Sequence, residues 1–197
     1  MLVTARDTGR HPGSFDRQPR LENDAIRLRP LVENDWEALF AVASDPLIWA
    51  GHPMTGRWQE PVFRAFFAEA LASRGALVAI DPATDAVIGS SRYDSSRVEP
   101  GEIEIGWTFL ARPSWGGTAN AAMKALMIRH ALVHFPQVVF FVGDANMRSR
   151  RAMAKIGGVL TERRYDPTIG GVIVPHVVFA VDRAAFAKRP LCQPTPG

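Results

Sequence analysis

The stretch Trp115-Gly116-Gly117-Thr118-Ala119-Asn120 lies between an apolar run at residues 103–110 and a long run of helix-forming residues at 118–134. The first run predicts a strand and the second a helix. The start of a helix leaves backbone amides without partners, its dipole favours negative charge, and glycines let a ligand approach the backbone closely. This stretch therefore predicts a strand–loop–helix unit that binds a phosphate-bearing ligand.

Composition predicts one globular domain. The 197 residues are 47% hydrophobic and 22% charged, enough for a sizeable core. A net charge of +3 is too small by itself to indicate a nucleic-acid-binding protein. The single cysteine, Cys192, excludes a disulfide framework and favours a reducing, cytoplasmic location. No apolar run approaches the length of a membrane span, and because the first residues are charged and lack an apolar run, we expect no secretory signal.

Metal chemistry is not indicated by the histidines. His130 and His134 are four residues apart, but no acid accompanies them in the pattern that binds zinc. We therefore expect no metal site.

The chain divides into three parts by composition. Residues 1–22 are polar and contain glycine and proline, which predicts a flexible tail. Residues 23–187 carry the periodic apolar patterns of a single domain, and residues 188–197 are proline-rich and predict a second tail. Within the domain we expect strands at 25–30, 76–80, 86–93, 102–110, 138–142, 159–165 and 172–181, and helices at 33–43, 59–73, 118–134 and 146–156. This order predicts an α/β sheet with helices on both faces.

Four motifs in order resemble the GCN5-related N-acetyltransferase (GNAT) superfamily, specifically its ribosomal-protein-alanine N-acetyltransferase-like (RimJ/RimL-type) branch. Residues 87–93 resemble the third strand of that fold, and Glu104-Ile105-Gly106-Trp107 resembles its fourth strand. Residues 115–120, followed by Lys124, resemble the acetyl-CoA loop, and the run from Asn146 to Ala152 resembles the start of the next helix. The resemblance covers roughly residues 23–185.

The resemblance implies a GNAT fold with a mixed, mostly antiparallel central sheet of about six to seven strands, splayed between the fourth and fifth strands. It also implies acetyl-CoA-dependent transfer of an acetyl group to a primary amine, by direct attack in a ternary complex. The acceptor is expected to be a small molecule or a peptide, with no nucleic-acid or membrane partner, and the protein a monomer or homodimer. Two alternatives stay open: a catalytically weakened CoA-binding module and a basic nucleic-acid-binding protein.

The cofactor-binding residues are implied by the same resemblance. The backbone of Thr108, Phe109 and Leu110 is assigned to pantetheine, and Asn146 and Ser149 to pantetheine or adenosine. The pyrophosphate is assigned to Ser114, Trp115, Gly116, Gly117, Thr118, Ala119 and Asn120. Residues 148–164 hold six basic residues against one acid, a local charge of +5 that suggests an anionic ligand, with Arg150 among its contacts. A solvated basic face is the alternative reading.

Two carboxylates are candidates for the general base. Glu102 and Glu104 alternate with apolar residues, so we expect them on one strand face with Gly106 and Thr108. A carboxylate on an inner strand is costly unless it is paired or functional. Glu104 is the first candidate, directly or through water, and Glu102 the second; a structural ion pair is the alternative for both.

The proton donor for the leaving thiolate is not identified by the sequence. Many members of the family carry a tyrosine seven residues after the asparagine at the helix start, and here that position is Met153. Water or another group would have to replace the tyrosine. Asn120 and Lys124, one helical turn apart, are either phosphate contacts or a surface pair.

Five residues are candidates for the acceptor pocket. They lie in the loop between the first two helices and on the strand at 86–93: Trp49, His52, Trp58, Ser91 and Tyr93. Ordinary packing at the edge of the core is the alternative for each of them.

Overall fold

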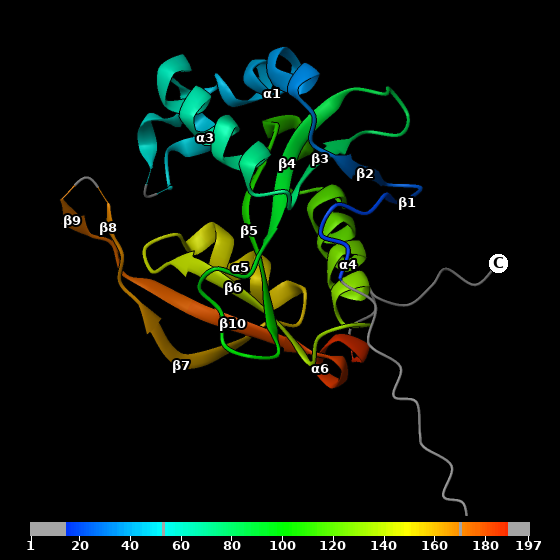
Figure 1. The fold of residues 1–197 in the computed structure, drawn as a ribbon, viewed down its shortest axis with the longest axis vertical. Coiled ribbons are helices and arrows are strands. Elements are labelled where there is room, and N and C mark those ends of the chain that lie inside the picture. Colours follow the sequence, from blue (N-terminus) through cyan, green and yellow to red (C-terminus); the bar gives the residue numbers. More distant parts are fainter. Residues whose placement is uncertain (1–14, 53, 170, 189–197) are drawn as a thin grey trace, which may run out of the picture.

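The computed structural model describes residues 15–52, 54–169 and 171–188. Its main feature is an eight-stranded sheet in the order β1-β2-β3-β4-β5-β6-β10-β7 (Figure 1). Neighbouring strands are antiparallel except β5 and β6, which are parallel. The strands are β1 (Leu21–Asn23), β2 (Ile26–Pro30), β3 (Ala76–Ile80), β4 (Val87–Asp94), β5 (Glu102–Leu110), β6 (Gln137–Gly143), β7 (Val159–Tyr165) and β10 (His176–Asp182).

Helices cover the two faces of the sheet in two groups. One group is α1 (Trp36–Ala43), α2 (Pro46–Trp49) and α3 (Glu60–Ala72), and the other is α4 (Ala119–Ala131) and α5 (Met147–Lys155). Short 3-10 turns η1 (Glu33–Asp35), η2 (Thr55–Trp58) and η3 (Arg112–Ser114) connect these elements, and α6 (Arg183–Ala187) follows β10. This mixed sheet with helices on both faces confirms the expected fold class.

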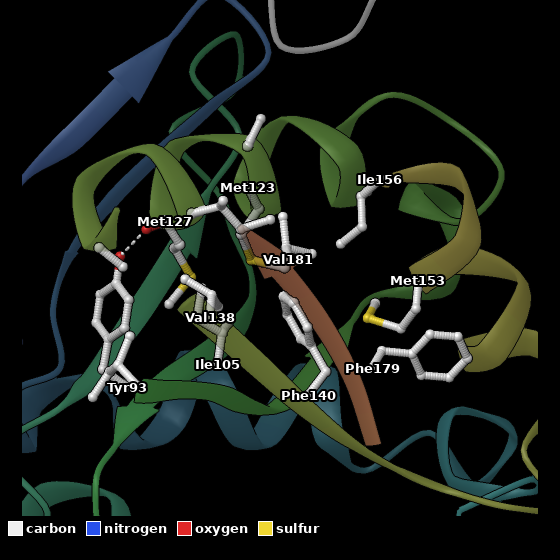
Figure 2. Packing of buried hydrophobic residues seen from close by; sticks show 14 of the residues in the cluster. Tyr93, Ile105, Met123, Met127, Val138, Phe140, Met153, Ile156, Phe179 and Val181 are labelled. Carbon is white, nitrogen blue, oxygen red and sulfur yellow. Dashed lines mark hydrogen bonds between the residues drawn. The ribbon is translucent and has the colours of Figure 1, made fainter. Parts of the chain in front are cut away.

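The core is split in two by the sheet because side chains of a strand alternate between its faces. In β3, Leu77 and Ala79 pack in the cluster that contains α4 and α5, whereas Val78 and Ile80 pack with α1, α2 and α3. Figure 2 shows the first cluster, where Met123 and Met127 of α4 lie over strand residues. A strand buried on both faces reads as a continuous apolar run, as β3 and most of β6 do.

The sheet opens between β5 and β6, as the resemblance implied for the fourth and fifth strands. The two strands pair at Glu102–Gln137, Ile103–Val138 and Glu104–Val139. The pairing ends there, although β5 continues to Leu110 and β6 to Gly143. The opening therefore exposes backbone from both strands at the centre of the molecule.

The last expected strand, at 172–181, is wrong as a single element. It is divided into β9 (Val172–Ile173), which pairs with β8 (Thr168–Ile169) as a separate hairpin, and β10 from His176. Pro175 lies between them and has no amide to donate to a strand partner, so the ladder is interrupted there. The sheet also has one strand more than the upper end of the expectation, because β1 lies in the segment expected to be a tail.

The folded domain includes residues before 23. Phe15 packs edge-on against Tyr93 at 5.1 Å and against Phe135 at 4.9 Å between ring centroids. Leu21–Asn23 forms β1, so at least residues 15–22 are part of the domain. The rest of the expected N-terminal tail, and the C-terminal tail from residue 189 with Cys192, lie outside the described residues. Within the described part of the chain, no helix is long and apolar enough to cross a membrane.

Candidate functional site

A cavity of about 500 Å³ lies where β5 and β6 separate. Its walls come from the second half of β5, the end of β6, the glycine loop, and one face each of α4 and α5. Ile48, Trp49 and His52 close it from the α2 side. A cavity of this size fits a small-molecule ligand.

A bulge in β5 shapes this cavity. Between two β4 residues, Ser90 and Arg92, the partner strand advances by three residues, from Gly106 to Phe109. Trp107 takes up the extra residue with a φ of 51°, in the left-handed region. One extra residue exchanges the two faces of a strand.

Because of the bulge, the prediction that Thr108 shares a strand face with Glu104 and Gly106 is wrong. The Glu104 side chain lies next to Gly106, where a Cβ would come within 2.5 Å of its Oε1. Thr108 lies on the other face, where its hydroxyl contacts Lys124 of α4. Glu104 and Thr108 therefore do not share one face, because the alternation of side chains shifts at the bulge.

The glycine loop is anchored at both ends and open in the middle. The Trp115 indole donates to the Leu110 carbonyl at 2.9 Å, and Arg148 stacks over the same ring at 3.9 Å. Gly116 has a φ of +75°, and a Cβ placed there would have no atom within 4 Å. Thr118, the N-cap of α4, makes no side-chain capping bond, so no side-chain cap competes with a ligand for the amides of the first turn.

Most of the predicted cofactor residues line this cavity. They are Thr108, Phe109, Leu110, Ser114, Trp115, Gly116, Gly117, Asn120, Asn146 and Ser149. Thr118, Ala119 and Arg150 do not line it. Arg150 instead pairs with Asp144 at 2.6 Å, and Asn146 is also the N-cap of α5, accepting from the Ser149 amide at 3.1 Å.

The basic cluster is only partly available to a ligand. Arg163 pairs with Glu102 at 2.7 Å and with Glu99 at 3.3 Å, so it serves the protein's own acids. Arg148, Arg151 and Lys155 of α5 line the cavity. Within this basic cluster, the residues that face the cavity are therefore those of α5.

Both candidate bases are buried and paired. Glu104 is 0% exposed and accepts two bonds from Arg97, at 2.6 Å and 2.5 Å. Burial raises the pKa of Glu104, and the bonds from Arg97 oppose that shift. Glu102 accepts from Arg163 and from the Glu99 amide. Neither carboxylate lines the cavity in this conformation, and each is paired with an arginine.

Arg97 is held by more than Glu104. Its guanidinium lies over the rings of Trp107, Phe141 and Tyr165 at 4.7, 4.6 and 4.8 Å from their centroids. A cation is attracted to the face of an aromatic ring. The loop between β4 and β5 is therefore bound to the opening of the sheet by one side chain.

Two of the predicted acceptor residues line the cavity and three do not. Trp49 and His52 are in its wall. The His52 Nδ1 accepts from the Met54 amide at 2.9 Å, its Nε2 is 3.3 Å from Arg57, and burial lowers the pKa of His52 to about 3. His52 is therefore neutral and both of its nitrogens face donors, which does not suit a general base.

The other three acceptor candidates serve packing or lie outside. Tyr93 is fully buried and its hydroxyl donates to the Met127 carbonyl at 2.7 Å, drawn as the dashed line in Figure 2. Ser91 is fully buried behind Thr108, to which it is bonded at 2.8 Å. Trp58 is 41% exposed and does not reach the cavity.

Three further residues line the cavity, and two of them, Met153 and Lys124, were noted from the sequence without either being committed to the site. Met153 lines it and packs with Ile156 and Phe179, as Figure 2 shows. His176 lines it from the start of β10. Lys124 also lines it, with 2% exposure, so the surface-pair reading of Lys124 is wrong. The N-x-x-x-K spacing was the sequence signal for Lys124; nothing local distinguished His176.

Comparisons with known proteins agree with this geometry. The family model described as the acetyltransferase (GNAT) domain matches residues 25–159. The search of curated proteins found no match.

Within the described part of the chain, no group of three or more His, Cys, Asp or Glu residues could hold a metal ion.

Solved structures with the same fold include three acetyltransferases. A GCN5-related N-acetyltransferase from Brucella melitensis is 21% identical with a TM-score of 0.76, over 89% of this chain and 83% of that chain. A putative acetyltransferase from T. thermophilus is 26% identical with a TM-score of 0.69, over 86% and 94% of the two chains. Mycobacterium smegmatis RimJ in complex with CoA-disulfide is 18% identical with a TM-score of 0.67, over 92% and 94%.

The family match spans more than half of the chain, and it includes the opened sheet and the glycine loop that build the cavity. The chain belongs to the GNAT family of acetyltransferases.

Proposed function

We propose that this protein transfers an acetyl group from acetyl-CoA to a primary amine, by direct attack while both substrates are bound. The observation that carries the proposal is the continuous cavity, which runs from the open glycine loop to the gap between β5 and β6. Family membership supplies the reaction class. Direct attack needs both substrates in one space, and a cavity that extends from α4 and α5 to α2 offers that space.

The residues present fit a coenzyme A group. Open space above Gly116 and the first-turn amides of α4 suit a pyrophosphate, and Arg148, Arg151 and Lys155 supply positive charge from α5. The second half of β5 pairs with β4 but no longer with β6, so its β6 edge supplies backbone groups for pantetheine. When bound, acetyl-CoA supplies the activated acetyl group, and this chain supplies its position and the proton transfers.

His176 is the group best placed to accept the proton of the amine in this conformation. Its Nδ1 is 2.7 Å from the Val174 carbonyl, so Nδ1 carries the hydrogen, and its Nε2 has no hydrogen bond among the described residues. Burial lowers the pKa of His176, which favours the neutral ring that a proton acceptor needs. Glu104 acts as the base only if Arg97 withdraws from it.

The acceptor is an amine of a small molecule or a peptide. We propose that the chain belongs to the ribosomal-protein-alanine N-acetyltransferase-like (RimJ/RimL-type) branch, and the sequence motifs support this proposal. A panel of amines assayed by thiol release tests this, with peptides that begin with alanine set against polyamines. Preference for the peptides supports the branch, and a preference for polyamines contradicts it.

The experiment that tests the function uses two glycine variants. Gly116 and Gly171 both have a positive φ, and a Cβ at either would meet no atom within 4 Å, so alanine strains both backbones alike. We expect Gly116→Ala to weaken coenzyme A binding about tenfold by calorimetry, because the new methyl group enters the space for the pyrophosphate. Gly171→Ala, in the β8–β9 hairpin, keeps the affinity of the unmodified protein.

If the two variants bind coenzyme A with equal affinity, the glycine loop is not part of the binding site. No binding of coenzyme A to the unmodified protein would refute the proposed function itself. Thermal stabilisation by acetyl-CoA gives an independent measure of the same binding.

A further inference from the structure

Lys124 is a buried cation without an anionic partner. It lies on α4 with 2% exposure, and its Nζ donates to the Thr108 hydroxyl at 2.5 Å and to the Ser91 hydroxyl at 3.3 Å. Its third neighbour is the ring of Phe140 of β6, 5.4 Å away. Among the described residues it forms no ion pair.

This environment makes the ammonium a ready proton donor. Burial lowers the pKa of Lys124 to about 7, and the nearby charge of Glu104 opposes that shift only in part. The Glu104 oxygens are already bonded to Arg97. The other elements around Lys124 face it with hydroxyls from β4 and β5 and a ring from β6, while Arg151 and Lys155 of α5 line the same cavity.

Lys124 lines the same cavity as the position where the family resemblance implies an acid. That position is Met153, where many members of the family carry their tyrosine acid. Its hydrogen-bond partner Thr108 belongs to the strand assigned to pantetheine. A thioether cannot donate a proton, so Lys124 is the buried donor that this wall of the cavity offers.

We propose that Lys124 is the catalytic acid of the acetyl transfer, which protonates the sulfur that leaves as the amine attacks the thioester. This proposal rests on the proposed function, because the leaving sulfur exists only when acetyl-CoA is bound. The amine nitrogen forms a bond to the carbonyl carbon, the bond from carbon to sulfur breaks, and sulfur takes its electron pair. Sulfur receives the proton from Nζ, and the neutral amine of Lys124 regains one from solvent or from the proton that the attacking nitrogen releases.

A purely structural role for Lys124 makes a different prediction. The Ser91 and Thr108 hydroxyls are 2.8 Å apart and stay bonded to each other without the lysine. Removing a buried ammonium that has no counter-ion also removes its cost of desolvation. We therefore expect Lys124→Met to be at least as stable as the unmodified protein, whereas a structural lysine would leave the variant less stable.

Steady-state kinetics provide the first test. We expect Lys124→Met to lower kcat about 100-fold with KM for acetyl-CoA unchanged within about threefold. The kcat of the unmodified protein falls as pH rises through the Lys124 pKa of about 7, because the acid must be protonated. In Lys124→Met, we expect this fall in kcat at high pH to be absent. Lys124→Arg keeps the charge but cannot release its proton, so we expect it to be equally slow. Lys188→Met, at an exposed lysine that follows α6 and does not line the cavity, serves as the control and keeps both kcat and KM.

Two measurements that do not depend on turnover complete the test. The ultraviolet absorbance of the thiolate should show that bound coenzyme A ionises at a lower pH in the unmodified protein than in Lys124→Met, by about one pH unit. In urea unfolding, the stability advantage of the variant should be greatest below the folded pKa of about 7. It should disappear as pH rises to the ordinary lysine value of 10.5, where the unfolded lysine is also neutral.

The outcomes separate this inference from the proposed function. Acetyl transfer with unchanged kcat in Lys124→Met, or a fully active Lys124→Arg, overturns the role of Lys124 and leaves the proposed function intact. A variant that is less stable than the unmodified protein and has an unaltered pH profile assigns Lys124 to the structure alone. Failure of the unmodified protein to bind coenzyme A refutes both.

Discussion

At the residue scale, the choice of base depends on which side chain is free to take a proton. Glu104 is fully buried beneath Arg97, whereas His176 reaches the cavity with one nitrogen that has no partner among the described residues. Local sequence favours the glutamate, since a carboxylate inside a strand is unusual. Pairing with an arginine seven residues earlier explains that carboxylate without a catalytic role.

Two variants distinguish the bases. His176→Asn keeps an amide that can donate to the Val174 carbonyl but removes the basic nitrogen, so we expect kcat/KM to fall about 100-fold. The unmodified protein should lose activity as pH falls through the pKa of His176, because a base must be neutral, and the variant should lack that limb. If Glu104→Gln instead removes the limb while His176→Asn retains it, Glu104 is the base.

At the scale of elements, Arg97 fastens the loop between β4 and β5 to the opening of the sheet. It bonds to Glu104 of β5 and lies over Phe141 of β6 and Tyr165 of β7. These contacts join three strands at the place where β5 and β6 no longer pair with each other. A buried ion pair contributes little net free energy to stability, but removing one partner leaves the other charge buried and unpaired.

We expect Arg97→Met to lower the free energy of unfolding by about 3–5 kcal/mol in urea, because Glu104 is left buried and unpaired. The control is Arg64→Met, which breaks the exposed pair with Glu60 and should cost less than about 1 kcal/mol.

The loss of unfolding free energy in Arg97→Met depends on pH. Burial raises the pKa of Glu104, so the folded protein tolerates the protonated form and is penalised as pH rises through that pKa. The loss should therefore be smaller at about pH 5 than at about pH 8. A loss that is equal at both values, or no larger than in the control, would mean that the pair does not hold the loop.

At the scale of the whole molecule, the segment before β1 closes the α4 face of the domain. The ring centroid of Phe15 lies 5.1 Å from that of His130 in α4 and 5.1 Å from that of Tyr93 in β4. His130 also lies 2.8 Å from the Asp16 carbonyl. The segment thus connects a helix to the sheet on the face that contains Lys124.

We expect Phe15→Ala to destabilise the protein by about 2 kcal/mol, because its ring packs against four others across two elements and the connection that follows α4. Leu47→Ala, at a leucine that is 53% exposed, should cost less than about 0.5 kcal/mol. Urea unfolding measures both. Equal losses in the two variants would show that the Phe15 ring does not contribute to the stability of the domain.

The sequence by itself determined the features that depend on neighbouring residues. Strand and helix periods, the glycine loop before α4 and the asparagine at the start of α5 are local patterns, and the structure has each of them within a few residues of its expected place. The failures are local too, since Pro175 divides the last strand and the four-residue α2 is too short to show a period.

Only the tertiary structure decided which polar side chains are free. Arg163 reaches Glu102 from 61 residues away, and Lys124 meets Ser91 from 33 residues away. The bulge at Trp107 decided which side of the sheet Thr108 faces. Burial and pairing depend on contacts between segments that are distant in the sequence, and those contacts distinguish a buried carboxylate paired with an arginine from a buried lysine that forms no ion pair among the described residues.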